Sequence, residues 1–231
     1  MANFAYLALN IGTIFIPFIA SFYKPQAFYK VWKYFFGANF LVAIPFVLWD
    51  IQFTRMGIWG FNSDYFLGTH ILNLPLEEVM FFACIPYACT FTYFALKYLL
   101  PETKFSKYQH FFKYLFLAIS VSFILFGYQQ VYTVTIGIVA FLMLLYSIWK
   151  SIDFTHIFLT YFLVTPFFLI VNGILTGSFI KEPVVWYNNV ENFGLRIGTI
   201  PIEDFMYSFV LISLNILLMN GLQQLSKKQT T

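Results

Sequence analysis

Long apolar stretches separated by short polar loops run through the whole chain. A helix crosses the hydrocarbon layer of a membrane, about 30 Å thick, in about 20 residues. Seven stretches are near this length, at about 4–22, 33–53, 75–99, 111–128, 130–149, 155–176 and 200–222. The pattern predicts an all-α integral membrane protein with seven transmembrane helices. Only Gly127-Tyr128-Gln129-Gln130 separates the fourth stretch from the fifth, so a single bent helix is the alternative there.

The composition supports a membrane protein and argues against several other classes. Hydrophobic residues make up 60% of the 231 residues and charged residues only 10%, which is too apolar for a soluble domain of this length. The two cysteines, Cys84 and Cys89, lie in one predicted helix and suggest neither a disulfide framework nor a metal site. No basic patch indicates nucleic-acid binding, and no G-x-G-x-x-G turn indicates a flavin or nicotinamide site. We therefore expect neither a metal nor a cofactor.

The charged residues are distributed unevenly between the two sides of the predicted membrane domain. If successive loops alternate between the sides, one side carries all but three of the 13 basic residues. The other side carries Arg55, Lys181 and Arg196, together with eight of the 10 acidic residues. Lysine-rich loops are typically cytoplasmic. We therefore predict a multi-pass protein of the cell membrane, surrounded by lipid, with its N-terminus outside and its C-terminus in the cytoplasm.

Two parts of the chain resemble each other at a constant offset of 126 residues. Residues 59–82 align with residues 185–208 without a gap, and the same offset carries the first predicted helix onto the fifth. We predict two three-helix repeats, 1–99 and 130–231, joined by a connecting helix within 100–129. A displacement of four helices gives both repeats the same orientation, related by an axis along the membrane normal.

Each repeat contains a proline followed closely by two carboxylates. These residues are Pro75, Glu77 and Glu78 in the first repeat and Pro201, Glu203 and Asp204 in the second. Proline fits the first turn of a helix, where the helix dipole favours an ionised acid and apolar surroundings favour a protonated one. Such an acid can serve as a general acid or base. We expect one member of each pair to face the interior and the other the lipid headgroups, because successive helix residues diverge by about 100°; capping acids at the membrane surface are the alternative.

Aromatic and amide side chains precede both acid pairs and are candidate substrate-binding residues. They are Trp59, Phe61 and Asn62 in the first repeat and Trp186, Tyr187 and Asn188 in the second. Aromatic faces can stabilise a carbocation, although they also form interfacial belts in membrane proteins. The amides either orient a carboxyl group or cap the loop. Arg196 is a further candidate, and an ion pair with a nearby acid is its structural alternative.

The motifs around the acid pairs resemble those of one family of membrane enzymes. The lycopene cyclase domain family has motifs similar to Trp59-Gly60-Phe61-Asn62, Leu74-Pro75-Leu76-Glu77-Glu78-Val79-Met80-Phe81-Phe82 and Ile200-Pro201-Ile202-Glu203-Asp204-Phe205. Its members are small membrane cyclases that occur as paired subunits in some bacteria, as fused chains in others, and within bifunctional fungal enzymes. The resemblance covers nearly the whole chain.

This resemblance implies a carotenoid cyclase that acts on lycopene or a related C40 carotenoid without a flavin. An acid protonates the terminal C1=C2 bond, the C5=C6 bond attacks the resulting cation, and loss of a proton from C6 closes a β-ring. By the same resemblance, Glu77, Glu78 and Glu203 supply acid and base. Asp204 stands where the family pattern has a second glutamate, and its side chain is one methylene shorter, which argues against Asp204 as the proton donor. We expect one site between the repeats, with Glu77 and Glu203 as the catalytic members of their pairs.

Two other functions fit the same features. A carotenoid hydratase would quench the same cation with water, so its product distinguishes it from a cyclase. A proton-coupled transporter or a non-enzymatic carotenoid-binding protein would also contain repeats and intramembrane acids. Against the transporter, the chain has no pair of interrupted half-helices and no row of acids across the membrane. The sequence defines neither the oligomeric state nor whether one or both ends of the carotenoid react.

Overall fold

The computed structural model describes residues 2–228, and the chain divides into two compact units. The first unit comprises Met1–Arg55, Ser63–Pro101 and Leu211–Thr231, and the second comprises Met56–Asn62 and Glu102–Val210. Each unit therefore contains residues from both predicted repeats. The repeat boundaries predicted from the sequence stay predictions, because the units group residues by contact and not by repeat.

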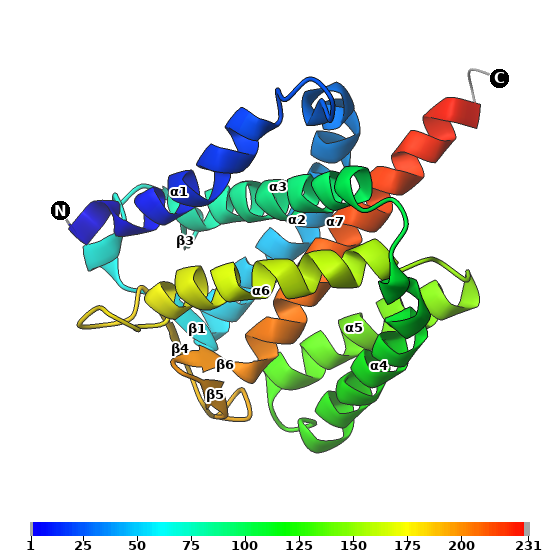
Figure 1. The fold of residues 1–231 in the computed structure, drawn as a ribbon. Coiled ribbons are helices and arrows are strands. Elements are labelled where there is room, and N and C mark those ends of the chain that lie inside the picture. The colour runs from blue at the N-terminus through cyan, green and yellow to red at the C-terminus, as the bar shows by residue number, and fades with distance from the viewer. Residues whose placement is uncertain (1, 229–231) are drawn as a thin grey trace. The chain divides into compact units, whose positions relative to one another are not determined.

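Seven α-helices form within the described residues, which confirms the predicted number (Figure 1). They are α1 (Ala5–Ala20), α2 (Trp32–Met56), α3 (Leu76–Leu99), α4 (Gln109–Phe126), α5 (Val131–Trp149), α6 (Thr155–Leu175) and α7 (Ile202–Lys228). Short 3-10 helices are η1 (Ala2–Phe4), η2 (Phe28–Val31), η3 (Ser63–Tyr65) and η4 (Lys104–Tyr108). Six α-helices are long and apolar enough to cross a membrane, whereas α1 has only 16 residues. The chain is an all-α membrane protein of two three-helix repeats with α4 as the connecting helix.

A turn at Gly127 separates α4 from α5, so the alternative of a single bent helix is wrong. The Gly127 N–H donates to the Phe123 carbonyl at the end of α4 (2.9 Å), and the Gln130 N–H donates to the Gly127 carbonyl (2.9 Å). A Cβ atom at residue 127 would lie 2.4 Å from a methyl carbon of Thr133, which explains the glycine. The two helices then lie side by side (Figure 1).

Buried polar contacts connect the helices of the first unit. The hydroxyls of Ser21, just after α1, and Tyr87 of α3 lie 2.6 Å apart, and the Trp32 indole N–H of α2 donates to the same phenol oxygen (3.0 Å). Asn39 of α2 donates to the amide oxygen of Asn215 of α7 (3.1 Å). In a membrane, where lipid is as apolar as the side chains, such interhelical hydrogen bonds help to fix which helix faces meet.

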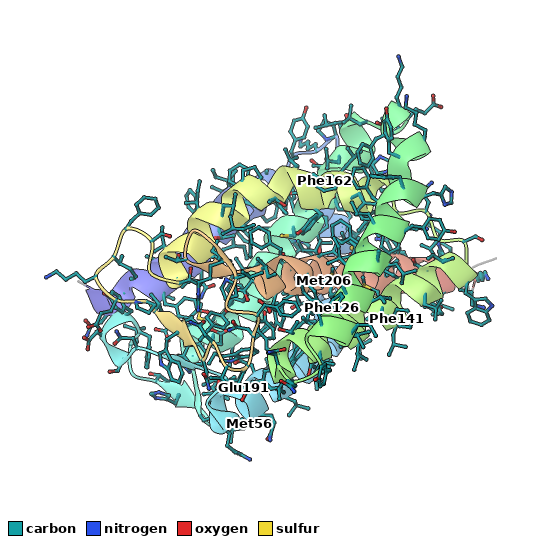
Figure 2. The ribbon with its side chains drawn as sticks, turned by 90° about the horizontal axis from the view of Figure 1, so that it is seen from below. Met56, Phe126, Phe141, Phe162, Glu191 and Met206 are labelled. Carbon is teal, nitrogen blue, oxygen red and sulfur yellow. The ribbon has the colours of Figure 1, made fainter. Side chains whose placement is uncertain are left out.

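Packed phenylalanine rings connect α4, α6 and α7 in the second unit. The ring centroids of Phe116 and Phe209 are 4.4 Å apart, and those of Phe158 and Phe209 are 5.5 Å apart. These tilted and stacked contacts add to the stabilisation that comes from burying large aromatic side chains. Other aromatic side chains are exposed, among them Phe126 at the end of α4 (Figure 2), as expected for helices whose outer faces contact lipid.

The same short hairpin precedes the acid pair in both repeats. Strand β2 (His70–Ile71) pairs with β3 (Leu74–Pro75), and β5 (Arg196–Ile197) pairs with β6 (Ile200–Pro201), both antiparallel. The residue directly after the first strand of each hairpin has a positive φ, 58° at Leu72 and 65° at Gly198. The predicted repeat therefore extends to backbone conformation. Each hairpin leads directly into the first turn of the helix that carries the acids.

Strands β1 (Trp59–Phe61) and β4 (Val185–Tyr187) pair antiparallel within the second unit. Gly60 lies opposite Trp186, and these two residues are equivalent by the offset of 126 residues. Flanking backbone hydrogen bonds run from Asn62 to Val184 (2.9 Å) and from Asn188 to Ile58 (2.8 Å). Because equivalent residues exchange equivalent bonds, the strand pair has local two-fold symmetry, as expected for two parallel repeats.

Candidate active site

Glu77, in the first turn of α3, has one engaged and one unengaged carboxyl oxygen. The side chain is fully buried, and its Oε1 accepts a hydrogen bond from the Leu67 backbone N–H (2.8 Å). Gly68 follows with a φ of 82°, a conformation that glycine adopts without strain. The other oxygen, Oε2, is buried and has no hydrogen-bond partner among residues 2–228.

Glu203, in the first turn of α7, repeats this arrangement in the second unit. Its Oε1 accepts from the Phe193 backbone N–H (2.8 Å) and also from the Thr133 hydroxyl (2.6 Å). Its Oε2 is again buried, with no partner in the described part of the chain. Phe193 is 126 residues after Leu67, so the loop contact that holds each glutamate belongs to the repeat.

This geometry defines where a proton can sit on each glutamate. A backbone N–H only donates, so Oε1 must accept whether the acid is ionised or neutral. In the neutral acid the proton therefore lies on Oε2, which no described group engages. A buried and unpartnered carboxylate oxygen is costly when it carries charge. Oε2 is thus the oxygen of each glutamate through which a proton can be transferred.

The second acid of each pair is held by a tyrosine from the first helix of its own repeat. Tyr6 of α1 donates to Oε2 of Glu78. Tyr132 of α5 donates to Oδ1 of Asp204 (2.7 Å). The two tyrosines are themselves 126 residues apart, so the tyrosine–acid contact is also a property of the repeat.

Asp204 has two further hydrogen-bond donors and a surrounding group of aromatic rings. Its Oδ2 accepts from the Asn172 side chain (2.8 Å) and from the Tyr187 hydroxyl (3.0 Å). The Trp59 ring centroid lies 5.1 Å from that of Tyr132 and 6.0 Å from that of Tyr187. We refer to Trp59, Tyr132 and Tyr187 as the aromatic group. Asp204 thus accepts hydrogen bonds from three side chains.

All four acids are buried, which corrects the expectation that one member of each pair faces the headgroups. The exposed fraction is 0% for Glu77 and Glu203, 8% for Glu78 and 5% for Asp204. The physical reason is that loop backbone covers one member of each pair while a tyrosine covers the other. These partners lie outside the acids' own helices, so the acids are not surface caps. Within residues 2–228, no three His, Cys, Asp or Glu side chains are grouped so that they could hold a metal ion.

The remaining candidate aromatic residues lie in the strand pair and not in the aromatic group. Phe61 is half-buried opposite Val185. Trp186 is 44% exposed and packs its ring against Gly60, where an added Cβ would lie 2.3 Å from a ring carbon. Of the four aromatic residues predicted near the acids, Tyr187 contacts Asp204 directly, and Trp59 packs against the two tyrosines that do so.

The candidate amides and Arg196 make contacts that shape the loops. Asn62 donates to the Glu182 carboxylate (3.1 Å), and the Asn188 side-chain oxygen accepts from the Val190 N–H (3.1 Å), so Asn188 caps its loop. The Arg196 guanidinium donates to the Thr199 carbonyl (2.6 Å) and to the Asn189 side chain (2.7 Å). It also lies 5.7 Å from the centre of the Tyr187 ring. The described partners of the guanidinium are thus a carbonyl and an amide, and not the carboxylate of the alternative interpretation.

Sequence reasoning missed four side chains that contact the acids. They are Tyr6, Tyr132, Thr133 and Asn172. For the two tyrosines a signal was available, because they are the tyrosines that the repeat offset superimposes in the first and fifth helices. Thr133 and Asn172 have no such signal, since a single polar residue in an apolar helix is common and points to no particular partner.

Comparison with known proteins assigns the chain to a family. The family model for lycopene cyclase matches residues 3–96 and 129–222, two copies that agree with the two repeats. A bifunctional lycopene cyclase/phytoene synthase from Aspergillus niger is 42% identical over 45 residues, a segment that covers 20% of this chain and 8% of the fungal protein. No solved structure matches the chain. Because the family model covers most of its residues, the chain belongs to the lycopene cyclase family.

Proposed function

We propose that this protein cyclises the open ψ-ends of lycopene, or of a related C40 carotenoid, to β-rings by acid–base chemistry without a redox cofactor. One observation carries the proposal. In each repeat, one carboxyl oxygen of a fully buried glutamate accepts a hydrogen bond from a loop N–H, and no described group forms a hydrogen bond with the other oxygen. Such a group is a proton donor in apolar surroundings, which is what protonation of a hydrocarbon double bond requires.

The reaction needs one proton in and one proton out for each ring. The acid gives its proton to C2 of the C1=C2 bond, which leaves a tertiary cation at C1. The electron pair of C5=C6 forms the C1–C6 bond and moves the cation to C5. Breaking the C6–H bond then supplies the electron pair of the new C5=C6 bond and releases a proton to a base. Atoms and electrons balance, so an acid, a base and shelter for the cation are sufficient.

The described contacts favour Glu77 and Glu203 as the donors. Their free Oε2 is the position of the transferable proton, whereas Glu78 and Asp204 accept hydrogen bonds from tyrosines. A carboxylate that accepts phenol hydrogen bonds is suited to act as a base or as a counter-charge to the cation. This assignment agrees with the expectation that the first carboxylate of each pair is the catalytic acid.

The aromatic group offers a means to stabilise the cation. Trp59, Tyr132 and Tyr187 lie within 6.1 Å of one another, measured between ring centroids. The negative face of an aromatic ring attracts a cation, by about 0.5–1 kcal/mol at exposed sites and about 2 kcal/mol or more when desolvated. We include Trp59 and Tyr187 as substrate-binding residues on this ground. For Phe61, Asn62, Trp186, Asn188 and Arg196, the proposed role is to shape the loops that hold these two.

Replacement of each glutamate tests the proposal in cells that accumulate lycopene. The wild-type protein should convert the red pigment to orange β-ring carotenoid, whereas Glu77→Gln and Glu203→Gln, which cannot donate a carboxyl proton, should lose most of this conversion. Glu102→Gln is the matched control, because Glu102 is exposed in the loop before α4. Chromatography of the pigments, with immunoblots of the membrane fraction, gives the readout. Unchanged lycopene with the wild-type protein present in the membrane contradicts the proposed function.

Isotope labelling tests the acid–base mechanism and separates it from hydration. In D2O each ring should gain one deuterium, at C2, because the acid exchanges with solvent before it protonates the double bond. A hydratase would instead add the elements of water and give an alcohol. Mass spectrometry of the pigments distinguishes these outcomes. Rings that form without deuterium would exclude a solvent-exchangeable acid as the donor.

A further inference from the structure

The second member of the acid pair is Glu78 in the first repeat and the shorter Asp204 in the second. Both carboxyl oxygens of Asp204 are engaged: Oδ1 by the Tyr132 hydroxyl, and Oδ2 by the Asn172 amide and the Tyr187 hydroxyl. A carboxylate has about four lone-pair sites. The three described donors therefore leave one site, on Oδ1, to take up a proton.

Comparison of the repeats shows that one donor of this set, the Tyr187 hydroxyl, is specific to the second repeat. Tyr132 has a counterpart in Tyr6, but the residue equivalent to Tyr187 is Phe61, which has no hydroxyl. Asp204 is also one methylene shorter than its counterpart, Glu78. A shorter side chain with donors on both oxygens has fewer positions available to its carboxylate. The second repeat thus holds a carboxylate at a fixed place, beside the aromatic group.

The proposed reaction has one step, the final loss of a proton, whose product depends on the position of the base. The cation at C5 can lose a proton from any of three neighbouring carbons. Loss from C6 gives the C5=C6 bond of a β-ring, loss from C4 gives the C4=C5 bond of an ε-ring, and loss from the methyl group on C5 gives the exocyclic bond of a γ-ring. All three hydrogens sit on carbons bonded to C5, so the position of the base decides among the products.

We propose that Asp204 is the base for this step and that Tyr132, Tyr187 and Asn172 are positioning residues that set the ring type. The inference rests on the proposed function. The C6–H electron pair becomes the new double bond, and the proton passes to Oδ1 of Asp204. Asp204 then releases this proton to solvent, and the donor takes up a solvent proton before the next ring, so the protons balance. The shortness of Asp204, which argues against a proton donor, is then explained by its role as a fixed acceptor.

The test is the ratio of ring types made by Tyr187→Phe and Asn172→Leu in lycopene-accumulating cells. Each variant loosens Asp204 and leaves Glu203 with its loop contact. We expect the share of ε- and γ-rings, relative to β-rings, to rise by about tenfold, the change expected from loss of one hydrogen bond to a charged group. Tyr161→Phe is the matched control, because this buried phenol donates to the Phe205 carbonyl and not to an acid (3.0 Å). Its ring ratio should equal that of the wild type.

The possible outcomes separate this inference from the proposed function. If the wild type forms no ring, the proposed function fails. If the wild type forms rings and the variants make less product at an unchanged ring ratio, the proposed function stands and the positioning role is overturned. Complete loss of rings from variants present at wild-type level also overturns it, because positioning leaves the proton donor intact. Should neither variant accumulate in the membrane, Asp204→Glu decides, since it reproduces the longer Glu78; an unchanged ratio overturns the inference.

Discussion

One hydroxyl distinguishes the two glutamates that share the loop contact. The Oε1 atom of Glu203 accepts from Thr133 as well as from the loop backbone, whereas the residue equivalent to Thr133 in the first repeat is Leu7. Glu77 therefore keeps its orientation with the loop N–H of Leu67 as the described donor on Oε1. The Thr133 hydroxyl is an addition to a contact that the first repeat makes without it.

Replacement of this hydroxyl should reduce activity without abolishing it. Thr133→Val keeps the shape of the side chain, and the Phe193 N–H still holds Oε1 of Glu203. A typical hydrogen bond contributes about 0.5–1.5 kcal/mol, so the rate of ring formation should fall about two- to tenfold. The rate is measured in isolated membranes with lycopene supplied in detergent. Thr135→Val is the control, because Thr135 donates to a carbonyl of its own helix. A loss as complete as that of Glu203→Gln, or no loss at all, would contradict this role.

At the scale of elements, the β1–β4 pair brings Trp59 and Tyr187 together next to Tyr132. Its register places Trp59 opposite Tyr187, and both rings then contact Tyr132. The pair tolerates little change at its centre. A Cβ atom at Gly60 would lie 2.3 Å from the Trp186 ring, so glycine is required there by close approach of the facing side chain.

Gly60→Ala should therefore destabilise the protein and displace Trp59 and Tyr187. Overpacking of a well-packed contact typically costs about 1–3 kcal/mol, because the Trp186 ring must move or the strands must separate. The midpoint of thermal aggregation in detergent, followed by fluorescence-detected size-exclusion chromatography, should fall by several degrees. The double variant Gly60→Ala/Trp186→Leu should recover most of this loss. Gly12→Ala is the control, since nothing lies within 4 Å of an added Cβ there. An unchanged midpoint in Gly60→Ala would show that the strands adjust without cost.

The sequence predicted where the helices begin and which residues carry charge, but not which helix faces meet. Pro75 and Pro201 predicted the starts of α3 and α7, and these helices begin at Leu76 and Ile202. In contrast, a membrane helix is apolar around most of its circumference, so periodicity does not reveal that Tyr6 faces Glu78. The burial of all four acids was missed for the same reason. The offset of 126 residues was the sequence feature that could have singled out Tyr6 and Tyr132, because it relates one tyrosine to the other.

At the scale of the whole molecule, the number of helices and the charges of the loops lead to one membrane topology. Seven spans place the two chain ends on opposite sides of a membrane, if α1 also crosses it. The last turn of α7 contains Lys227 and Lys228, and the positive-inside rule puts such residues in the cytoplasm. We therefore propose that the N-terminus is outside. The loops that lead into α3 and α7 are then also outside, because four helices separate them.

Labelling of single cysteines can test this topology in intact cells. Cys84 and Cys89 are both buried, and their replacement by alanine gives a background without thiols. Ser63→Cys and Val190→Cys place one thiol in the exposed loop before each acid-bearing helix, and Ser106→Cys places one between α3 and α4. A membrane-impermeant maleimide should label residues 63 and 190 in intact cells, and residue 106 only after the membrane is permeabilised.

The comparison between residues 63 and 190 is the decisive part of this experiment. Parallel repeats require both to be labelled from the same side, whichever side that is, because a displacement of four spans returns the chain to the side it left. Labelling of one from outside and the other from inside would contradict the four spans between them and would mean that one of the helices α3 to α6 does not cross the membrane. If both are labelled only after permeabilisation, the repeats stay parallel but the lysine-rich side faces outward, contrary to the positive-inside rule.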